Sequence, residues 1–133
     1  DLFRGNVLLL GDRVSGVLDF EFSSPDLRAM DFAVGLFAFG VSARNVEGGW
    51  PPIEAFAAGY RRRVALSPEE IGALPMLLRL REAVTLVHWA GRLRQGLTTE
   101  GELARRSGDM LELDGWLSRY GEELVRRVEN TAR

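Results

Sequence analysis

The apolar residues near the start of the chain follow the pattern of two short β-strands joined by a turn. An apolar run covers Val7 to Leu10, turn-forming residues follow at Gly11-Asp12-Arg13, and apolar residues return from Val14 to Leu18. Short apolar runs separated by Gly and Asp are typical of a β-hairpin. We therefore predict a hairpin within residues 7–22.

Beyond this stretch, apolar residues recur at the three- and four-residue spacing that is typical of amphipathic helices. Some of these segments are preceded by residues that favour the start of a helix. The clearest case is the Ser67-Pro68 pair, which combines an N-cap with a first-turn proline. A Gly- and Pro-rich loop is expected over 44–52, and a polar connection over 96–107. The expected helices cover residues 27–41, 53–64, 76–93 and 110–128, the last of them capped by Asp109. A further helix is expected to start at Ser67, and Pro75 either begins a second segment or kinks the first.

The helix expected over residues 76–93 is the most apolar of these segments. Leu80, Val84 and Val87 share one side with two further small or apolar positions, which predicts a central buried helix. His88 is the only histidine of the chain and lies within this segment. We therefore expect it to be a packed or hydrogen-bonded core residue rather than a catalytic one.

Composition and charge narrow the class of protein. The chain has 133 residues, 46% of them hydrophobic and 27% charged, which suits one α+β, mostly α domain with a single core. The formal net charge of −2 gives no sign of a nucleic-acid or membrane surface. No cysteine is present, which excludes disulfides and a thiolate nucleophile and fits a cytoplasmic location.

Three chelating side chains bracket the predicted hairpin. Asp1 stands five residues before Asn6, and Asp19 follows the second strand. Because a hairpin brings its two ends together, we expect Asn6 and Asp19 to be neighbours in space. Amide and carboxylate oxygens are hard ligands that suit Mg²⁺ held against phosphates, and a preceding Asp suits a base for a hydroxyl proton.

These residues occur in the order of a known signature. The spacing D-x-x-x-x-N at Asp1 and Asn6, the run Val17-Leu18-Asp19-Phe20-Glu21 and the later Asp31-Phe32-Ala33 together resemble the aminoglycoside phosphotransferase and choline kinase superfamily. Within it, the chain is most similar to type II homoserine kinases. The resemblance implies the helical C-terminal lobe of a protein-kinase-like fold. It assigns residues 1–22 to the catalytic loop, hairpin and metal motif, and residues 23–133 to a helical substrate-binding subdomain.

The resemblance also implies roles for individual residues. Asp1 aligns with the catalytic Asp, Asn6 and Asp19 align with the Mg²⁺ ligands, and Asp31 aligns with an acid that braces the catalytic loop. Arg4 lies inside the catalytic loop and is a candidate for contact with phosphate or for a structural ion pair. Glu21 stands where protein kinases have Gly, and it either touches metal or substrate or points to solvent.

The implied activity is transfer of the γ-phosphoryl group of ATP, with Mg²⁺, to a hydroxyl of an amino acid, an amino alcohol or an aminoglycoside, with homoserine favoured. The alternative is a non-catalytic protein that uses the kinase fold for binding or as a scaffold. The family's phosphate-covering loop and its Lys find no match in this sequence. We therefore expect this chain alone to lack kinase activity, and we expect apolar surface near the hairpin that favours self-association.

Several further residues are candidates for contact with substrate. Trp50 is left open between a substrate-facing and a packed position, whereas Trp116 is expected in the core. The run Arg61-Arg62-Arg63 is expected to be a solvated helix end. Acids available to bind a cationic acceptor are Glu21, Asp26, Glu47 and Glu54.

Overall fold

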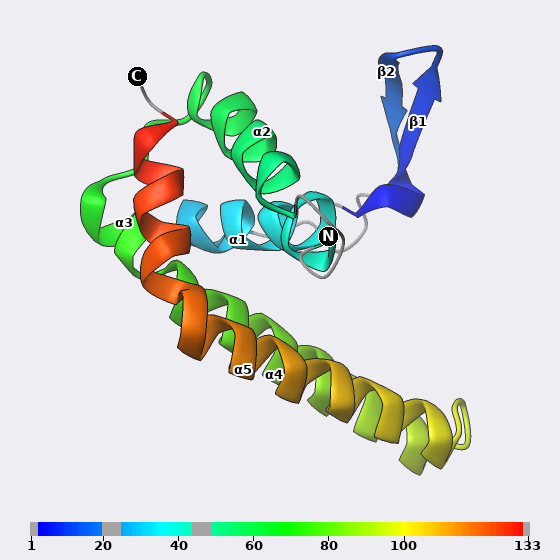
Figure 1. The fold of residues 1–133 in the computed structure, drawn as a ribbon. Coiled ribbons are helices and arrows are strands. Elements are labelled where there is room, and N and C mark those ends of the chain that lie inside the picture. The colour runs from blue at the N-terminus through cyan, green and yellow to red at the C-terminus, as the bar shows by residue number, and fades with distance from the viewer. Residues whose placement is uncertain (1–2, 20–24, 44–48, 132–133) are drawn as a thin grey trace.

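The computed structural model describes residues 3–19, 25–43 and 49–131. Within these ranges the chain forms one antiparallel hairpin followed by five α-helices, with a 3₁₀ turn before the hairpin and another after the first helix. The prediction of a mostly α, α+β fold is therefore confirmed. Figure 1 shows the hairpin at one end of the molecule, the first two helices in the middle and two long helices extending away from them.

The hairpin consists of β1 (Val7–Leu10) and β2 (Arg13–Val17), preceded by the 3₁₀ turn η1 (Arg4–Asn6). Gly11 opens the two-residue loop with φ of +64°, which is the position where type II′ turns require a left-handed residue. Val7 pairs with Val17 and Leu10 with Arg13, and the register shifts between Leu8 and Leu9 as in a β-bulge. The strands pair with each other and make at most marginal contact with the described helices (Figure 1).

The core of the molecule forms where α1 (Arg28–Phe39) crosses α2 (Trp50–Arg61). Phe32 and Leu36 of α1 and Ile53 of α2 are fully buried, and the Phe32 ring lies 4.9 Å from the ring of Tyr60. Gly40 follows α1 and lies so close to α2 that an added Cβ would stand 2.9 Å from the Cα of Ile53. This glycine therefore allows the two helices their short separation. A second 3₁₀ turn, η2 (Val41–Ala43), follows it.

The short helix α3 (Pro68–Gly72) begins as the sequence predicts. Ser67 accepts a hydrogen bond from the Glu70 backbone N–H at 3.3 Å, and the Glu70 carboxylate accepts one from the Ser67 N–H at 2.7 Å. This reciprocal capping box satisfies two backbone donors that the helix itself cannot. Glu70 also binds Arg28 at 2.6 Å and 2.9 Å, which ties α3 to the start of α1.

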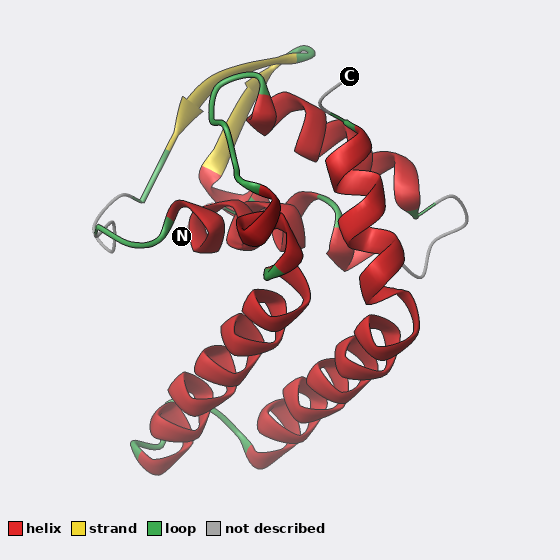
Figure 2. Cartoon of the chain, turned by 90° about the vertical axis from the view of Figure 1, so that its left-hand side faces the viewer, coloured by secondary structure: helices red, strands yellow, loops and turns green. Residues whose placement is uncertain are grey.

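Helices α4 (Leu74–Arg94) and α5 (Glu100–Asn130) form a long antiparallel pair. Both views show the first part of α5 alongside α4, and the far ends of the pair project beyond the other helices, whereas the last part of α5 continues towards α2 and α3 (Figures 1 and 2). Leu77 and Leu78 of α4 and Leu113 and Leu117 of α5 are buried in the part nearest the core. No helix in the described part of the chain is both long enough and apolar enough to cross a membrane.

The start of α5 differs from the prediction. The helix begins after Thr99, whose side chain accepts a hydrogen bond from the Glu102 N–H at 3.2 Å, and it continues without a break through the expected cap at Asp109. Glu102 pairs with Arg105 and Arg106, and Arg105 also pairs with Asp109 at 2.7 Å. These one-turn ion pairs and the packing on α4 support a helix through residues that look polar in isolation.

The exposure of α4 also differs from the prediction. Leu80, Val84 and Val87, expected to be buried, are 48%, 61% and 73% exposed, and His88 is exposed as well. The buried face of α4 lies elsewhere, at Leu74, Leu77, Leu78 and Glu82. The expectation of a core histidine is therefore wrong, because this part of α4 is covered by α5 on one side only. His88 makes an edge contact with the ring of Trp89 at 6.2 Å.

Candidate active site

The base of the hairpin holds Asn6 in a defined position. Asn6 is 7% exposed and ends the 3₁₀ turn η1, in which its N–H donates to the Phe3 carbonyl at 3.0 Å. Its carbonyl accepts a hydrogen bond from the Leu18 N–H at 2.8 Å, one step beyond the Val7–Val17 pair. The ladder therefore continues past the strands and fixes Asn6 against the residue that precedes Asp19.

Asp19 has an unusual backbone. Its φ of +64° lies in the left-handed region, and among the described residues it is the one non-glycine with a positive φ. Asp and Asn tolerate this conformation better than most residues, but it still costs about 1–2 kcal/mol. Strained backbone of this kind is concentrated at functional sites. The chain is turned at Asp19, directly after it leaves the Asn6–Leu18 hydrogen bond.

Asp19 directly follows Leu18, the residue that hydrogen-bonds to Asn6 across the base of the hairpin, and a contact between the Asn6 and Asp19 side chains stays a prediction. Asp19 is exposed, so its carboxylate is accessible, and an amide oxygen beside a carboxylate is a donor pair that fits Mg²⁺. A cluster of three or more His, Cys, Asp or Glu side chains that could hold a metal is absent from the described ranges. Asp1 and Glu21 lie outside the described residues, and Arg4 is exposed in η1.

Asp31 lies in the first turn of α1 and is bound by α2. The Tyr60 hydroxyl donates to its carboxylate at 2.8 Å, and also to the Arg28 carbonyl at 3.3 Å. Burial, followed by this hydrogen bond, raises the pKa of Tyr60 to about 12. The contact shown for Asp31 therefore joins α1 to α2, and its expected contact with the catalytic loop stays a prediction.

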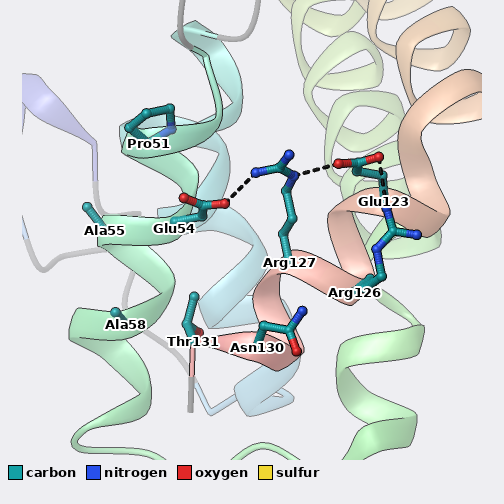
Figure 3. Close-up of a pocket in the computed structure, with 9 residues that line it drawn as sticks. All are labelled: Pro51, Glu54, Ala55, Ala58, Glu123, Arg126, Arg127, Asn130 and Thr131. Carbon is teal, nitrogen blue, oxygen red and sulfur yellow. Dashed lines mark hydrogen bonds and ion pairs between the residues drawn. The ribbon is translucent and has the colours of Figure 1, made fainter. Parts of the chain in front are cut away.

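A pocket of about 770 Å³ lies between α2 and the end of α5, and residues of the hairpin do not line it (Figure 3). Arg127 stands at its centre and bridges two carboxylates, Glu54 of α2 at 2.6 Å and Glu123 of α5 at 2.7 Å. Both carboxylates raise the pKa of Arg127. Glu54, an available acid for a cationic acceptor by sequence, is thus engaged in an ion pair that joins the two helices. Asp26 precedes α1, and its carboxylate accepts a hydrogen bond from the Leu27 N–H at 2.6 Å. Glu47 lies outside the described residues.

The remaining candidates have structural partners. Trp50 packs on Trp116 at 5.5 Å between ring centroids, and the Arg127 guanidinium lies 4.6 Å over the Trp50 ring. Both tryptophans are half-buried in this cluster, which agrees with the packed alternative. Arg61, expected in solvent, instead donates to the Val128 and Glu129 carbonyls at the end of α5, whereas Arg62 and Arg63 are exposed. Sequence spacing gave no signal for this cross-helix capping.

The part of the chain that contains the hairpin and the first helices matches a family of known proteins. The phosphotransferase enzyme family (APH) matches residues 1–74, the part that carries Asn6, Asp19 and Asp31. Homoserine kinase from Rhizobium etli (strain CIAT 652) is 40% identical over 116 residues, which cover 84% of this chain and 34% of that protein. Homoserine kinase from Nitrobacter winogradskyi is 44% identical over 82 residues, and that from Methylorubrum populi is 40% identical over 84 residues, each covering 59% of this chain and 24% of the relative.

These matches define the scope of the similarity. No solved structure is significantly similar to the chain. The chain spans about a quarter to a third of the length of the curated relatives that it matches. The family match covers more than half of the chain, including the hairpin, the first helix and the second. The chain therefore belongs to the phosphotransferase enzyme family.

Proposed function

We propose that this chain is the helical C-terminal lobe of an ATP- and Mg²⁺-dependent kinase that phosphorylates the hydroxyl of a small molecule. The observation that carries the proposal is the hydrogen bond of Asn6 with Leu18, directly before a left-handed Asp19, in a chain of the phosphotransferase family. The activity is proposed for a protein of the relatives' length, because the chain spans only part of them.

Each residue of the site would have a defined task. Asn6 and Asp19 would hold Mg²⁺ through an amide oxygen and a carboxylate, and the bound ion would neutralise charge on the ATP phosphates. Asp1 would orient the acceptor hydroxyl and take its proton as the new O–P bond forms and the bond to ADP breaks. Asp31 would brace the catalytic loop, and Arg4 and Glu21 would be accessory residues near the phosphate.

For the acceptor we propose an amino acid or amino alcohol with a free hydroxyl, and homoserine before the others. The support is that the matched relatives are named homoserine kinases and that the best of these alignments extends over 84% of the chain. It therefore includes most of the helical part, where specificity in a shared fold resides.

The test is an ATP-consumption screen with the full-length protein that contains this chain, over homoserine, choline, ethanolamine, sugars and aminoglycosides. We expect turnover with homoserine, and its loss in Asp19→Asn and Asp1→Asn. Asp12→Asn is the matched control, because Asp12 is an exposed carboxylate in the hairpin loop. Turnover that survives Asp1→Asn would show that the base is assigned wrongly. For the 133-residue chain alone we expect no turnover.

A thermal-shift measurement separates the kinase from a non-catalytic scaffold. Mg²⁺–ATP should raise the melting temperature of the full-length protein, because a ligand that binds only the folded state stabilises it. The shift should be lost in Asp19→Asn. No shift in the parent protein would favour the scaffold.

We also propose self-association of this chain through the hairpin. Leu9, Leu10 and Val14 are 64%, 77% and 63% exposed on a pair of strands that packs on little but itself. Exposed apolar side chains beside unpaired strand edges favour association with another surface.

A further inference from the structure

A smaller pocket, of about 350 Å³, lies where α4 and α5 meet the end of α1. It is within the size range of sites for small molecules. Its walls come from three parts of the fold, so that charged and apolar groups distant in sequence converge on it. The lining residues used below are Phe37, Ser42, Arg81, Thr85, Arg106 and Glu112.

Two arginines of this pocket are held in place by aromatic rings. The Arg81 guanidinium lies 4.0 Å from the centroid of the Phe37 ring, and the Arg106 guanidinium lies 3.8 Å from that of Trp89. Their side chains are only 23% and 28% exposed. A guanidinium that stacks by its flat face keeps its edge N–H groups available for a planar anion.

Both arginines have N–H groups that are available to bind a ligand. Arg81 pairs with Glu82 through Nη1, and Arg106 pairs with Glu102 through Nε at 2.8 Å. Within the described part of the chain, their other N–H groups make no further hydrogen bond, although each guanidinium carries five. Burial lowers the pKa of Arg81, and repulsion from Arg106 lowers it further against the opposing effect of Glu82. An anion between the two guanidinium groups would relieve this repulsion.

The same pocket offers acceptors for a cation. The Ser42 hydroxyl donates to the Ala38 carbonyl at 3.1 Å, and the Thr85 hydroxyl donates to the Arg81 carbonyl at 3.0 Å, so both oxygens remain free to accept. Glu112 also lines the pocket and is exposed, with no ion pair to any described residue. A ligand with one carboxylate and one ammonium would therefore find partners for both.

We propose that this pocket binds the α-amino-acid part of the acceptor, with the carboxylate on Arg81 and Arg106 and the ammonium on Glu112 and the hydroxyl oxygens. The choice of homoserine as that amino acid rests on the proposed function, whereas the binding mode rests on the pocket. A carboxylate held by two arginines forms charge-assisted hydrogen bonds, which are about twice as strong as neutral ones.

Calorimetric titration of the full-length protein with L-homoserine tests this assignment. Two analogues separate the contacts: γ-hydroxybutyrate lacks the ammonium, and homoserinol lacks the carboxylate. We expect Arg106→Gln to weaken homoserine binding about tenfold or more, as loss of a hydrogen bond between charged groups does. Homoserinol binding should change little in this variant. Glu112→Gln should remove the preference for homoserine over γ-hydroxybutyrate.

Arg63→Gln is the matched control, because Arg63 is exposed and lies outside the pocket. Arg106 is the better target than Arg81, since Glu102 keeps Arg105 as a partner when Arg106 is removed, whereas Glu82 is buried beside Arg81. A melting curve of each variant without ligand establishes that it is folded. Arg106→Lys, which keeps the charge, should recover part of the affinity.

The outcomes distinguish this proposal from the kinase activity. Homoserine binding that is weakened by Arg106→Gln, with no ATP consumption, supports the pocket and contradicts the kinase. ATP consumption with homoserine and an unchanged KM in Arg106→Gln and Glu112→Gln overturns the pocket and leaves the kinase intact. Absence of binding by any amino acid at millimolar concentration also overturns the pocket.

Discussion

At the scale of single residues, the hydrogen bond between Tyr60 and Asp31 has a consequence for alkaline pH. The pKa of Tyr60 is raised to about 12 in the folded chain, first by burial and then by Asp31, from an ordinary value of 10.0. Because the unfolded chain loses this proton first, the free energy of unfolding should fall as pH rises from 10 towards 12. The contribution of Tyr60 is fully present below pH 10.

Substitution of this tyrosine tests the argument. Tyr60→Phe should lower the free energy of unfolding by about 1 kcal/mol at neutral pH, the usual value of one lost hydrogen bond. In alkaline solution, the free energy of unfolding of this variant should also fall less steeply with pH, because the titration of Tyr60 no longer contributes. Tyr120→Phe removes the other tyrosine, which is 37% exposed, and serves as the control in urea unfolding at several pH values. If the free energy of unfolding fell equally steeply with alkaline pH in Tyr60→Phe and in the parent, Tyr60 would not be the group responsible.

Single residues also show what the sequence can reveal about the site. The pairing of Asn6 with the end of the second strand was predictable, because a hairpin joins its ends through local hydrogen bonds. The left-handed backbone at Asp19 was not predictable, since the type of a residue does not by itself determine its φ. The partner of Glu54 is Arg127, 73 positions later, and a pair so distant in sequence depends on how α2 and α5 pack.

At the scale of secondary-structure elements, the start of α3 should respond to acid. Arg28 and the Ser67 N–H lower the pKa of Glu70, so its contribution to stability is present above the ordinary carboxyl pKa and is lost as pH falls below it. Glu70→Gln should therefore be less stable than the parent at neutral pH, and the difference should shrink below pH 4.5. Thermal melts between neutral pH and pH 3, where acids are about fully protonated, would measure it.

The cap itself offers a second comparison. Ser67→Ala should cost about 1 kcal/mol at neutral pH. Because the Ser67 hydroxyl also lowers the pKa of Glu69, part of this cost should shrink in acid. A difference from the parent that does not shrink in acid for Glu70→Gln would show that its carboxylate is not the titrating group.

The crossing of α1 and α2 should depend on Gly40. A Cβ at this position would lie 2.9 Å from the Cα of Ile53, and backbone cannot move aside as a side chain can. Gly40→Ala should therefore destabilise the chain by about 1–3 kcal/mol through overpacking. Gly108→Ala in α5 meets no atom within 4 Å and should instead add up to about 1 kcal/mol of helix propensity. Urea unfolding of the two variants measures whether each loses or gains stability. Equal changes in the free energy of unfolding would contradict the close approach of Gly40 to Ile53.

The presence of each helix was more predictable than the residues at which it begins and ends. Ser67-Pro68-Glu69-Glu70 predicts α3 correctly, because capping chemistry acts within four residues. The cap of helix α5, Thr99, lies ten residues before the predicted cap at Asp109. Its first part is polar and contains Gly101 and Gly108, and it is supported by α4 across the interface rather than by its own composition.

At the scale of the whole molecule, the sequence indicates that α4 is apolar on more than one side but not which side is covered. Leu77 and Leu78 are buried, whereas Val84 and Val87 are exposed because only α5 accompanies α4 along its far end. The spacing of apolar residues indicates that a helix has an apolar face, whereas tertiary packing determines which face is buried. The exposure of His88 follows from the same arrangement.

Two apolar surfaces could therefore drive self-association, and they can be tested separately. The hairpin exposes Leu9 and Leu10, and its strand edges offer unpaired backbone groups in addition. A charge at an exposed strand position opposes pairing between strands, so Leu9→Lys with Leu10→Lys should lower the association constant of the 133-residue chain. Sedimentation velocity over a range of concentrations measures the change.

The matched variant is Val84→Lys with Val87→Lys, which places the same two charges on the exposed face of α4. The apolar side chains of α4 stand on a closed helix whose backbone hydrogen bonds are made, so this face has side-chain contacts alone to offer a partner. We expect the α4 variant to associate as the parent does and the hairpin variant to be more monomeric. The reverse result would move the interface from the hairpin to α4.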